Sequence, residues 1–402
     1  MACCCLLAAA CIGIFTNTYG IFYTPISEAL SAGRGSVALH AAISGLITGL
    51  FGPVIMKAMS RFKLQIIIGS GMVLMSGSAF LTAAANSVWQ LNILGVLRGI
   101  GCACCYIPVL TVILGNWFDR YYGTVMGITF SFSGIAGAIF SPMLSFIIEN
   151  QGYQAALLAA GGIIIVLCMP GLILCRTKPS ELKTEKLEKE AEDIGKNIKE
   201  KAVFQHGEAK VNLYTKESFI ILCVIGFLSV FISGFSQHLT GYSEAIGVGT
   251  MTGVIMMSVA MAGNIIFKLL SGILIDLVGE VQTAVVALAL TVAALFVFAF
   301  QPSARILLYF AAFLFGAVYS LGAVSLAAIS RKIFGKEKYG EAYAIISALT
   351  CVGSSLSLTA IGYIYDLSGG YIMALAGMIL FGLLSVFGLG IIWRNIQKKS
   401  SL

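Results

Sequence analysis

Two basic residues, Lys268 and Arg98, lie inside long apolar stretches of this sequence. A charged side chain at the centre of a membrane helix costs about 2.5–3.5 kcal/mol on insertion scales, so such a residue is a candidate for function. Asn264 precedes Lys268 by four residues, which places both side chains on one face of a helix. An ammonium group with an amide donor beside it would suit a substrate carboxylate.

Other interpretations of the polar residues remain open. Lys268 could extend its side chain to the membrane surface. Arg98 could be a structural residue satisfied by backbone carbonyls or helix ends, or it could organise conformational exchange. His238 is either an interfacial histidine or, because imidazole titrates near physiological pH, a gating or proton-carrying group. The first apolar stretch contains three polar residues, Asn17, Tyr19 and Tyr23. They either line a cavity or form hydrogen bonds between helices.

The composition indicates that these residues belong to a membrane protein. Hydrophobic residues make up 58% of the 402 residues and charged residues only 11%, whereas a soluble domain has about 25% charged residues. The apolar runs are long enough to cross a bilayer, and they lack the period-two alternation of barrel strands. The expected fold class is therefore an all-α membrane protein.

The apolar runs, bounded by charge, Gly or Pro, predict twelve membrane spans. They lie at 2–26, 36–58, 64–85, 88–114, 122–148, 154–175, 217–242, 248–273, 281–300, 304–330, 340–363 and 371–393. A long segment that alternates Lys and Glu separates the sixth from the seventh and reads as a solvated linker. We expect an N-terminal six-helix bundle at 1–175, a cytoplasmic linker at 176–216 and a C-terminal six-helix bundle at 217–402.

The two halves also share glycine landmarks. Gly52 pairs with Gly272, Gly123 with Gly340 and Gly152 with Gly370, at separations of 220, 217 and 218 positions. Recurrence at a nearly constant separation indicates a duplicated unit, as in transporters built from repeats. We therefore expect the two bundles to be pseudo-symmetric.

The distribution of Lys and Arg predicts the orientation. With the N-terminus inside, 21 of the 25 Lys and Arg residues fall on the cytoplasmic side, and Arg34 and Arg305 fall outside. The remaining two, Arg98 and Lys268, lie within spans. By the positive-inside rule, both termini and the linker are expected in the cytoplasm of a multi-pass protein of the cell (plasma or inner) membrane.

Two motifs carry a resemblance to a known family. The G-x-x-x-D-x-x-G pattern formed by Gly272, Asp276 and Gly279 resembles the loop signature of the major facilitator superfamily, and the segment that begins Arg98-Gly99 resembles its membrane-embedded arginine motif. The resemblance implies that Asp276 pairs with helix ends or basic residues across the two halves. The corresponding stretch of the first half keeps its glycine and Arg61 but lacks the acid.

Finer features resemble the monocarboxylate porters and oxalate/formate antiporters within that superfamily. They are the Asn-Trp-Phe and glycine pattern at 116–134, the His-Leu pattern at 237–247 and the Gly-Asn and Lys pattern at 263–272. The resemblance implies that Lys268 faces the substrate carboxylate, where the family usually has Arg. This chain departs from the porters at Ile26, where they have Lys, and at Asn264, where they have Asp. Span 340–363 also lacks the antiporters' basic residue, which favours a monocarboxylate over a dicarboxylate.

We therefore expect a secondary active transporter that moves a small organic anion by alternating access. The alternatives are a transporter of a drug or sugar, or a membrane sensor with the same fold. The spans show no nucleophile–base pair, metal cluster or paired carboxylates, so we expect no enzyme activity, no cofactor and no metal site. The expected partners are the anion, the lipid bilayer and a coupled proton or counter-anion. We expect a monomer that does not bind nucleic acid.

The coupling ion follows from the titratable groups in the spans. The sequence places no Asp or Glu deep in any span, and the amide of Asn264 does not titrate. Anion exchange or facilitated diffusion is therefore favoured over proton symport. If symport operates, His238 is the expected proton carrier, with Lys268 as the other titratable candidate.

Overall fold

The structure is a computed structural model that describes residues 1–176, 213–301 and 303–400. All regular secondary structure within these residues is helical, and twelve helical segments are long and apolar enough to cross a membrane. Each coincides with one predicted span. The chain is thus a multi-pass, all-α membrane protein with twelve transmembrane helices, which confirms the expected fold class.

The first six spans are built from ten helical elements, two of which are irregular. The first span includes a π-helix, η1, and a 3₁₀ turn, η2. The elements are α1 (Ala2–Ala8), η1 (Ala9–Asn17), η2 (Tyr19–Phe22), α2 (Tyr23–Ala29), α3 (Arg34–Met59), α4 (Leu64–Ala83), α5 (Val88–Ala103), α6 (Ile107–Trp117), α7 (Tyr122–Gln151) and α8 (Tyr153–Leu174).

The last six spans follow the same plan. Their elements are α10 (Leu213–Ser233), η3 (Gly234–His238), α11 (Leu239–Ala245), α12 (Thr250–Val278), α13 (Glu280–Ala299), α14 (Arg305–Phe315), α15 (Val318–Ser320), η4 (Leu321–Ser325), α16 (Leu326–Ser368) and α17 (Ile372–Ser400). Gly335 interrupts α16 with a φ of 76°, a conformation that glycine adopts without steric cost. This break separates the tenth span from the eleventh.

Glycines also set several of the boundaries between spans. Gly152, Gly249 and Gly279 have φ values of 88°, 91° and 103°, which residues with a side chain rarely adopt. Gly152 and Gly279 each join two helices directly, and Gly249 precedes α12. The chain can therefore reverse direction between neighbouring spans with very short loops.

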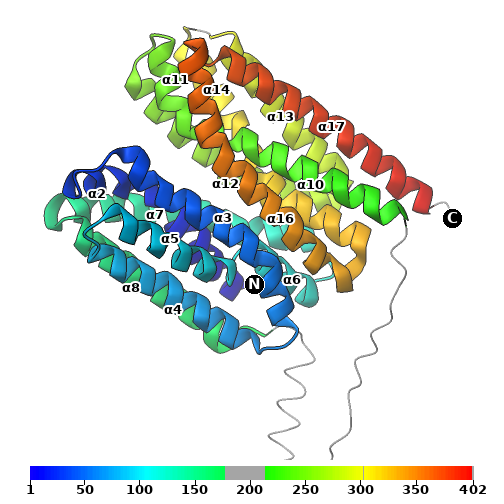
Figure 1. The fold of residues 1–402 in the computed structure, drawn as a ribbon. Coiled ribbons are helices and arrows are strands. Elements are labelled where there is room, and N and C mark those ends of the chain that lie inside the picture. Colours follow the sequence, from blue (N-terminus) through cyan, green and yellow to red (C-terminus); the bar gives the residue numbers. More distant parts are fainter. Residues whose placement is uncertain (177–212, 302, 401–402) are drawn as a thin grey trace, which may run out of the picture.

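The helices form two groups in space (Figure 1). Elements α1 to α8 pack in one bundle and α10 to α17 in the other, and the chain leaves both bundles at the same end for residues 177–212. We call this end the linker end. Most of the predicted linker lies outside the described residues, so the predicted domain boundaries remain a prediction.

The bundles meet along two helix pairs, α7 with α12 and α3 with α16, where glycines allow close approach. A Cβ atom at Gly272 would lie 2.5 Å from the carbonyl oxygen of Gly123 and 2.9 Å from Cα of Gly127. A Cβ atom at Gly49 would lie 2.7 Å from Cβ of Cys351. Small residues at such crossings are typical of packed membrane helices.

Candidate functional site

Lys268 lies on α12 with its ammonium group inside the protein. Its side chain is 5% exposed. The Nζ atom donates a hydrogen bond to Oγ of Ser133 at 3.1 Å, and it lies 3.5 Å from the carbonyl oxygen of Phe130. Both partners belong to α7 of the other bundle. The amine thus points across the interface between the bundles and does not extend to the membrane surface.

Asn264 lies one helical turn from Lys268 and is also buried. Its Oδ1 atom has no hydrogen-bond partner, and its Nδ2 atom has only a 3.9 Å contact with the sulfur of Met261. Buried amides normally have partners, and an unpaired one calls for an explanation. The amide of Asn264 therefore has hydrogen-bonding capacity to offer a ligand beside Lys268.

The first span contributes Asn17 to the same place. Its Nδ2 atom donates to the carbonyl oxygen of Ser133 at 3.3 Å, so Ser133 contacts both Asn17 and Lys268. Thr16 and Asn17 are exposed, whereas their neighbours Phe15 and Thr18 are buried. Two polar side chains in the middle of the first span are therefore accessible next to the lysine's partner.

Arg98 occupies a second, separate cluster within the N-terminal bundle. It is 4% exposed, and its Nη2 atom donates to the carbonyl oxygen of Phe15. Its guanidinium lies 3.5 Å from the ring centroid of Tyr19 and 4.4 Å from that of Phe15. Its Nη1 atom lies 3.1 Å from Nε2 of His40. Arg98 is thus held by π-systems, a backbone carbonyl and an imidazole.

His40, a buried residue of α3, was not among the site residues predicted from the sequence. Its Nδ1 atom lies 2.6 Å from the carbonyl oxygen of Leu91. A carbonyl only accepts hydrogen bonds, so Nδ1 carries the proton and Nε2 is left to accept from Arg98. A signal was present in the sequence, because an ionisable residue inside a span needs a partner and His40 lies within the second predicted span.

The predicted site residues therefore fall into three places. Lys268 and Asn17 contact Ser133, and Asn264 lies one turn from Lys268. Arg98, Tyr19 and Tyr23 lie in the arginine cluster, and His238 lies in neither place. The ring of Tyr19 is 6.1 Å from that of Tyr23. His238 ends η3, is half-buried, and has its ring 6.0 Å from that of Tyr371.

Neither buried cation has a carboxylate partner. Among residues 1–176, 213–301 and 303–400, Lys268 and Arg98 form no ion pair, whereas Asp119 and Glu280 do, and both of these acids lie at the linker end. Lys268 and Arg98 contact only neutral groups. An uncompensated buried charge is unfavourable, so these two residues are electrostatically matched to an anionic ligand.

At the linker end, Asp276 bonds the start of α7. Its carboxylate accepts hydrogen bonds from the backbone nitrogens of Gly123 at 3.0 Å and Thr124 at 2.7 Å, and from Oγ1 of Thr124 at 2.6 Å. The residue at the N-cap of α7, Tyr121, makes no side-chain cap. Asp276 thus caps a helix of the other bundle and neutralises its positive N-terminal end. Of the other motif residues, Gly272 allows the close approach of α12 to α7, and Gly279 ends α12. Arg61 is exposed in the loop after α3.

A second contact across the linker end was not anticipated from the sequence. Asp119 accepts from Nη2 of Arg331 at 2.8 Å and from Nζ of Lys336 at 2.9 Å. The hydrogen bond from Lys336 and the charges of both bases hold the pKa of Asp119 below its usual value. Tyr339 also donates to the carbonyl oxygen of Thr111 at 2.6 Å. The two bundles are therefore joined by hydrogen bonds at this end.

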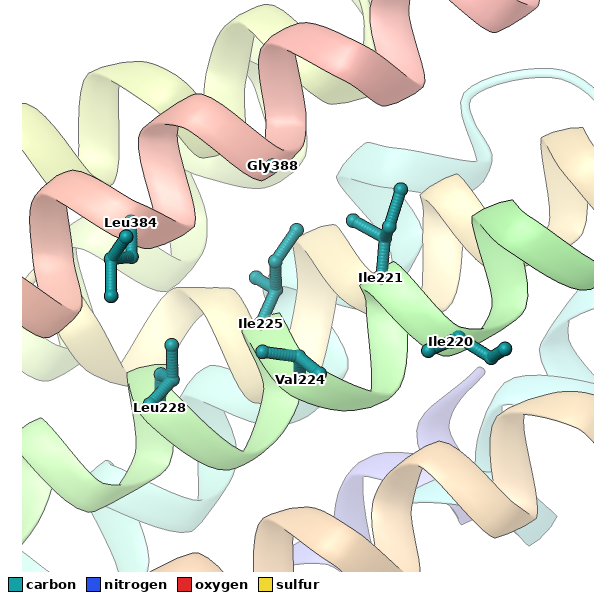
Figure 2. Close-up of a pocket in the computed structure, with 7 residues that line it drawn as sticks. All are labelled: Ile220, Ile221, Val224, Ile225, Leu228, Leu384 and Gly388. Carbon is teal, nitrogen blue, oxygen red and sulfur yellow. The ribbon is translucent and has the colours of Figure 1, made fainter.

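A groove on the outside of the C-terminal bundle offers no alternative site for an anion. It lies between α10 and α17 and is lined by aliphatic side chains and one glycine (Figure 2). The lining residues are Ile220, Ile221, Val224, Ile225, Leu228, Leu384 and Gly388. None of these side chains can pair with a carboxylate. In the part of the chain that the structure describes, no group of three His, Cys, Asp or Glu residues could hold a metal ion either.

Comparison with known proteins places the chain among transporters. A family model described as Major Facilitator Superfamily matches residues 5–301 and 252–401. Monocarboxylate transporter 12 of Xenopus laevis is 27% identical over 279 residues, and its human counterpart is 26% identical over 291 residues. These matches cover 65% and 68% of this chain but only 60% and 56% of the relatives.

Two further proteins match over nearly the whole chain. An uncharacterized transporter of Bacillus subtilis, YcxA, is 25% identical over 380 residues, which is 91% of this chain and 88% of that protein. The solved structure of the proton:xylose symporter XylE superposes with a TM-score of 0.71 at 13% identity, covering 98% of this chain and 94% of the other. At that identity, the superposition establishes the shared fold.

Proposed function

This chain belongs to the Major Facilitator Superfamily, and we propose that within this family it transports a small organic anion, with monocarboxylates as the substrate class. The observation that carries the proposal is the pair of buried cations, Lys268 and Arg98, that have no carboxylate partner among the described residues. A bound anion would supply the missing charge.

The first contact of the anion would be Lys268. Its ammonium and Nδ2 of Asn264, whose contact is with the sulfur of Met261 at 3.9 Å, lie one turn apart on α12, so together they offer donors to the two oxygens of one carboxylate. Thr16 and Asn17 would provide the polar approach from the first span. A single ammonium at this place suits one carboxylate better than two. The names of the two monocarboxylate transporter 12 relatives agree with this substrate class.

Alternating access would move the anion between the two sides of the membrane. The hydrogen bonds of Asp276, Asp119 and Tyr339 join the bundles at the linker end, so the substrate would enter from the opposite end in this conformation. Transport would require these bonds to break while the bundles rock about the substrate.

Uptake into liposomes tests the substrate class. The purified protein would be reconstituted and offered radiolabelled L-lactate, pyruvate, oxalate and D-xylose. We expect saturable uptake of lactate or pyruvate that the other monocarboxylate inhibits, and no inhibition by oxalate or xylose. Saturable xylose uptake, with no uptake of either monocarboxylate, would overturn the proposal.

We further propose that the linker end faces the cytoplasm of the cell membrane, as the excess of Lys and Arg predicts. In a cysteine-depleted variant, single cysteines would be placed in the linker and in segment 31–36. An impermeant thiol reagent added to intact cells should label segment 31–36 and leave the linker unlabelled. Labelling of the linker from outside would reverse the orientation.

A further inference from the structure

A chain of contacts connects the lysine of the C-terminal bundle to the overlooked histidine of the N-terminal bundle. Lys268 donates to Ser133, and Asn17 donates to the backbone of the same serine. Two residues before Asn17, the carbonyl oxygen of Phe15 accepts from Arg98. Arg98 in turn contacts His40. A change at the anion site can therefore reach His40 through residues in direct contact.

The imidazole of His40 is held in one tautomer. Its Nδ1–H donates to the carbonyl oxygen of Leu91 at 2.6 Å, so Nε2 carries a free electron pair that faces Nη1 of Arg98 at 3.1 Å. A proton on Nε2 would meet the N–H of a guanidinium at hydrogen-bond distance. While Arg98 stays in this position, its N–H group occupies the electron pair of Nε2, and its positive charge opposes the protonation of Nε2.

The hydrogen bonding of Arg98 in this position is incomplete, and a bound anion could complete it. Its Nε atom is buried without a hydrogen-bond partner, and a carboxylate can accept two parallel N–H bonds from a guanidinium. The acceptor of its Nη2 atom, Phe15, is followed directly by the exposed residues Thr16 and Asn17. An anion near these side chains would lie close to the guanidinium.

Among the described residues, the other titratable groups facing His40 do not carry charge at physiological pH. The ring of Tyr19 lies 5.2 Å from the imidazole, and Tyr23 packs behind Tyr19. Phenols ionise near pH 10 in water. The charge that controls proton access to His40 is therefore that of Arg98.

We propose that His40 is a proton-binding site of this protein and that Arg98 couples it to the anion. The inference rests on the proposed anion transport. When the carboxylate binds, Arg98 turns toward it and Nε2 of His40 takes a proton from water on the side to which the site is open. The anion and the proton then cross together with no net charge, and both leave when Arg98 returns to the imidazole. This site makes proton symport the expected mode, in place of the exchange that the sequence favoured, and it assigns the proton to His40 and not to His238.

Simultaneous measurement of substrate and proton tests the inference. Proteoliposomes containing a trapped pH dye would be offered radiolabelled L-lactate and pyruvate. Wild type should acidify the lumen by about one proton for each carboxylate that enters. His40→Gln should abolish this acidification while preserving counterflow exchange of the labelled carboxylate, which needs no net proton movement. The matched variant His238→Gln should behave as wild type.

The possible results separate this inference from the proposed function. If wild type takes up neither probe, both proposals fail. If wild type takes up a probe without acidification, or if His40→Gln still acidifies the lumen, the proton site is wrong and anion transport stands. Counterflow by His40→Gln shows that the variant folds and binds the substrate.

A second measurement decides the case if His40→Gln does not fold. The chain has three histidines, His40, His206 and His238, so the variant His206→Gln/His238→Gln retains only His40. With ¹⁵N-labelled histidine, the Nε2 signal should be that of an unprotonated nitrogen without substrate and should move to the protonated position when L-lactate or pyruvate is added. A signal that remains unprotonated at saturating concentrations of both probes would overturn the inference.

Discussion

The two helix pairs that join the bundles have the same backbone plan and different chemistry. On α12, Gly272 crosses α7, and on α3 the corresponding Gly52 lies near the carbonyl oxygen of Ala344 in α16. Both crossings depend on small residues that bring the helices close together. The duplicated halves therefore share the contact geometry on which rocking depends.

The side chains one turn before these glycines differ. Lys268 precedes Gly272 by four residues and reaches across the interface to Ser133. Thr48 precedes Gly52 by four residues, but its hydroxyl donates to the carbonyl oxygens of Ser44 and Gly99 within its own bundle. At the position one turn before the glycine, a charge that faces the other bundle is therefore present on α12 and not on α3.

The side chains one turn after the glycines differ in the same way. Asp276 caps the start of α7 through three hydrogen bonds. Its counterpart four residues after Gly52 is Met56, whose Cε atom would lie 2.8 Å from a Cβ atom at Gly340. The repeat thus retains its close-packing glycines in both copies, whereas Lys268 and Asp276 of α12 have uncharged counterparts on α3, Thr48 and Met56.

The largest effect of breaking this asymmetry is expected at Lys268. A charge-assisted hydrogen bond contributes roughly 1.5–3 kcal/mol, so Lys268→Gln should weaken the apparent affinity for L-lactate or pyruvate by about 10- to 100-fold. Lys268→Arg should retain part of the function, because it keeps the charge. Inhibition of labelled uptake into proteoliposomes by unlabelled substrate measures these affinities.

The matched control is the counterpart on α3. Thr48→Val removes a hydroxyl that bonds only within the N-terminal bundle, so the affinity should stay that of wild type. Unchanged affinity in Lys268→Gln would show that the lysine has no part in binding. An equal loss in Thr48→Val would show that the two helices contribute symmetrically.

The next effect concerns the cap that α12 supplies to α7. Loss of a helix N-cap costs about 0.5–2 kcal/mol, so Asp276→Ala should raise the population in which the linker end is open by about 2- to 30-fold. Met56→Leu keeps the apolar contact of the other helix pair and should leave this population unchanged.

Thiol labelling can report this opening. Val112 is half-buried beside Gly340, with its Cγ2 atom 2.8 Å from where a Cβ atom would stand, so Val112→Cys in a cysteine-depleted background is partly covered while the bundles are closed. The labelling rate follows the open population when opening and closing are fast. A rate in Asp276→Ala equal to that of the parent would show that the cap does not hold the bundles together.

The fold followed from the sequence because its signals are long and repeated. Each span is a run of apolar residues that only a helix can carry through lipid, and all twelve were found. The irregular pieces within spans, such as the π-helix Ala9–Asn17, were not predicted. Their apolar sequence resembles that of the flanking α-helix, and the packing of neighbouring helices decides the local pitch.

The site was predictable in part. Spacing on one helix linked Asn264 to Lys268, and the motif implied a pairing of Asp276 across the halves, which the hydrogen bonds to Gly123 and Thr124 now show in atomic detail. Contacts between distant spans could not be predicted from spacing or from a motif. The pairing of Arg98 with His40 joins residues 58 positions apart, and only the packing of α3 against α5 brings them together.

The smallest effect is expected at Asp119, the carboxylate that the N-terminal bundle offers to Arg331 and Lys336. Its side chain is 75% exposed, and exposed ion pairs contribute little, so Asp119→Asn should raise labelling at Val112→Cys by less than about fivefold. Added salt should reduce this difference.

Because pairing lowers the pKa of Asp119, the contribution of Asp119 to stability should be complete above the usual carboxyl pKa and should disappear only as the pH falls through the lowered value. Thermal unfolding of wild type and Asp119→Asn should therefore differ equally at pH 7 and pH 5. Glu280→Gln is the control, because Glu280 pairs with Lys332 inside the C-terminal bundle at 2.6 Å. An equal rise in labelling for Glu280→Gln would show that surface charge in general, and not the contact between bundles, governs opening.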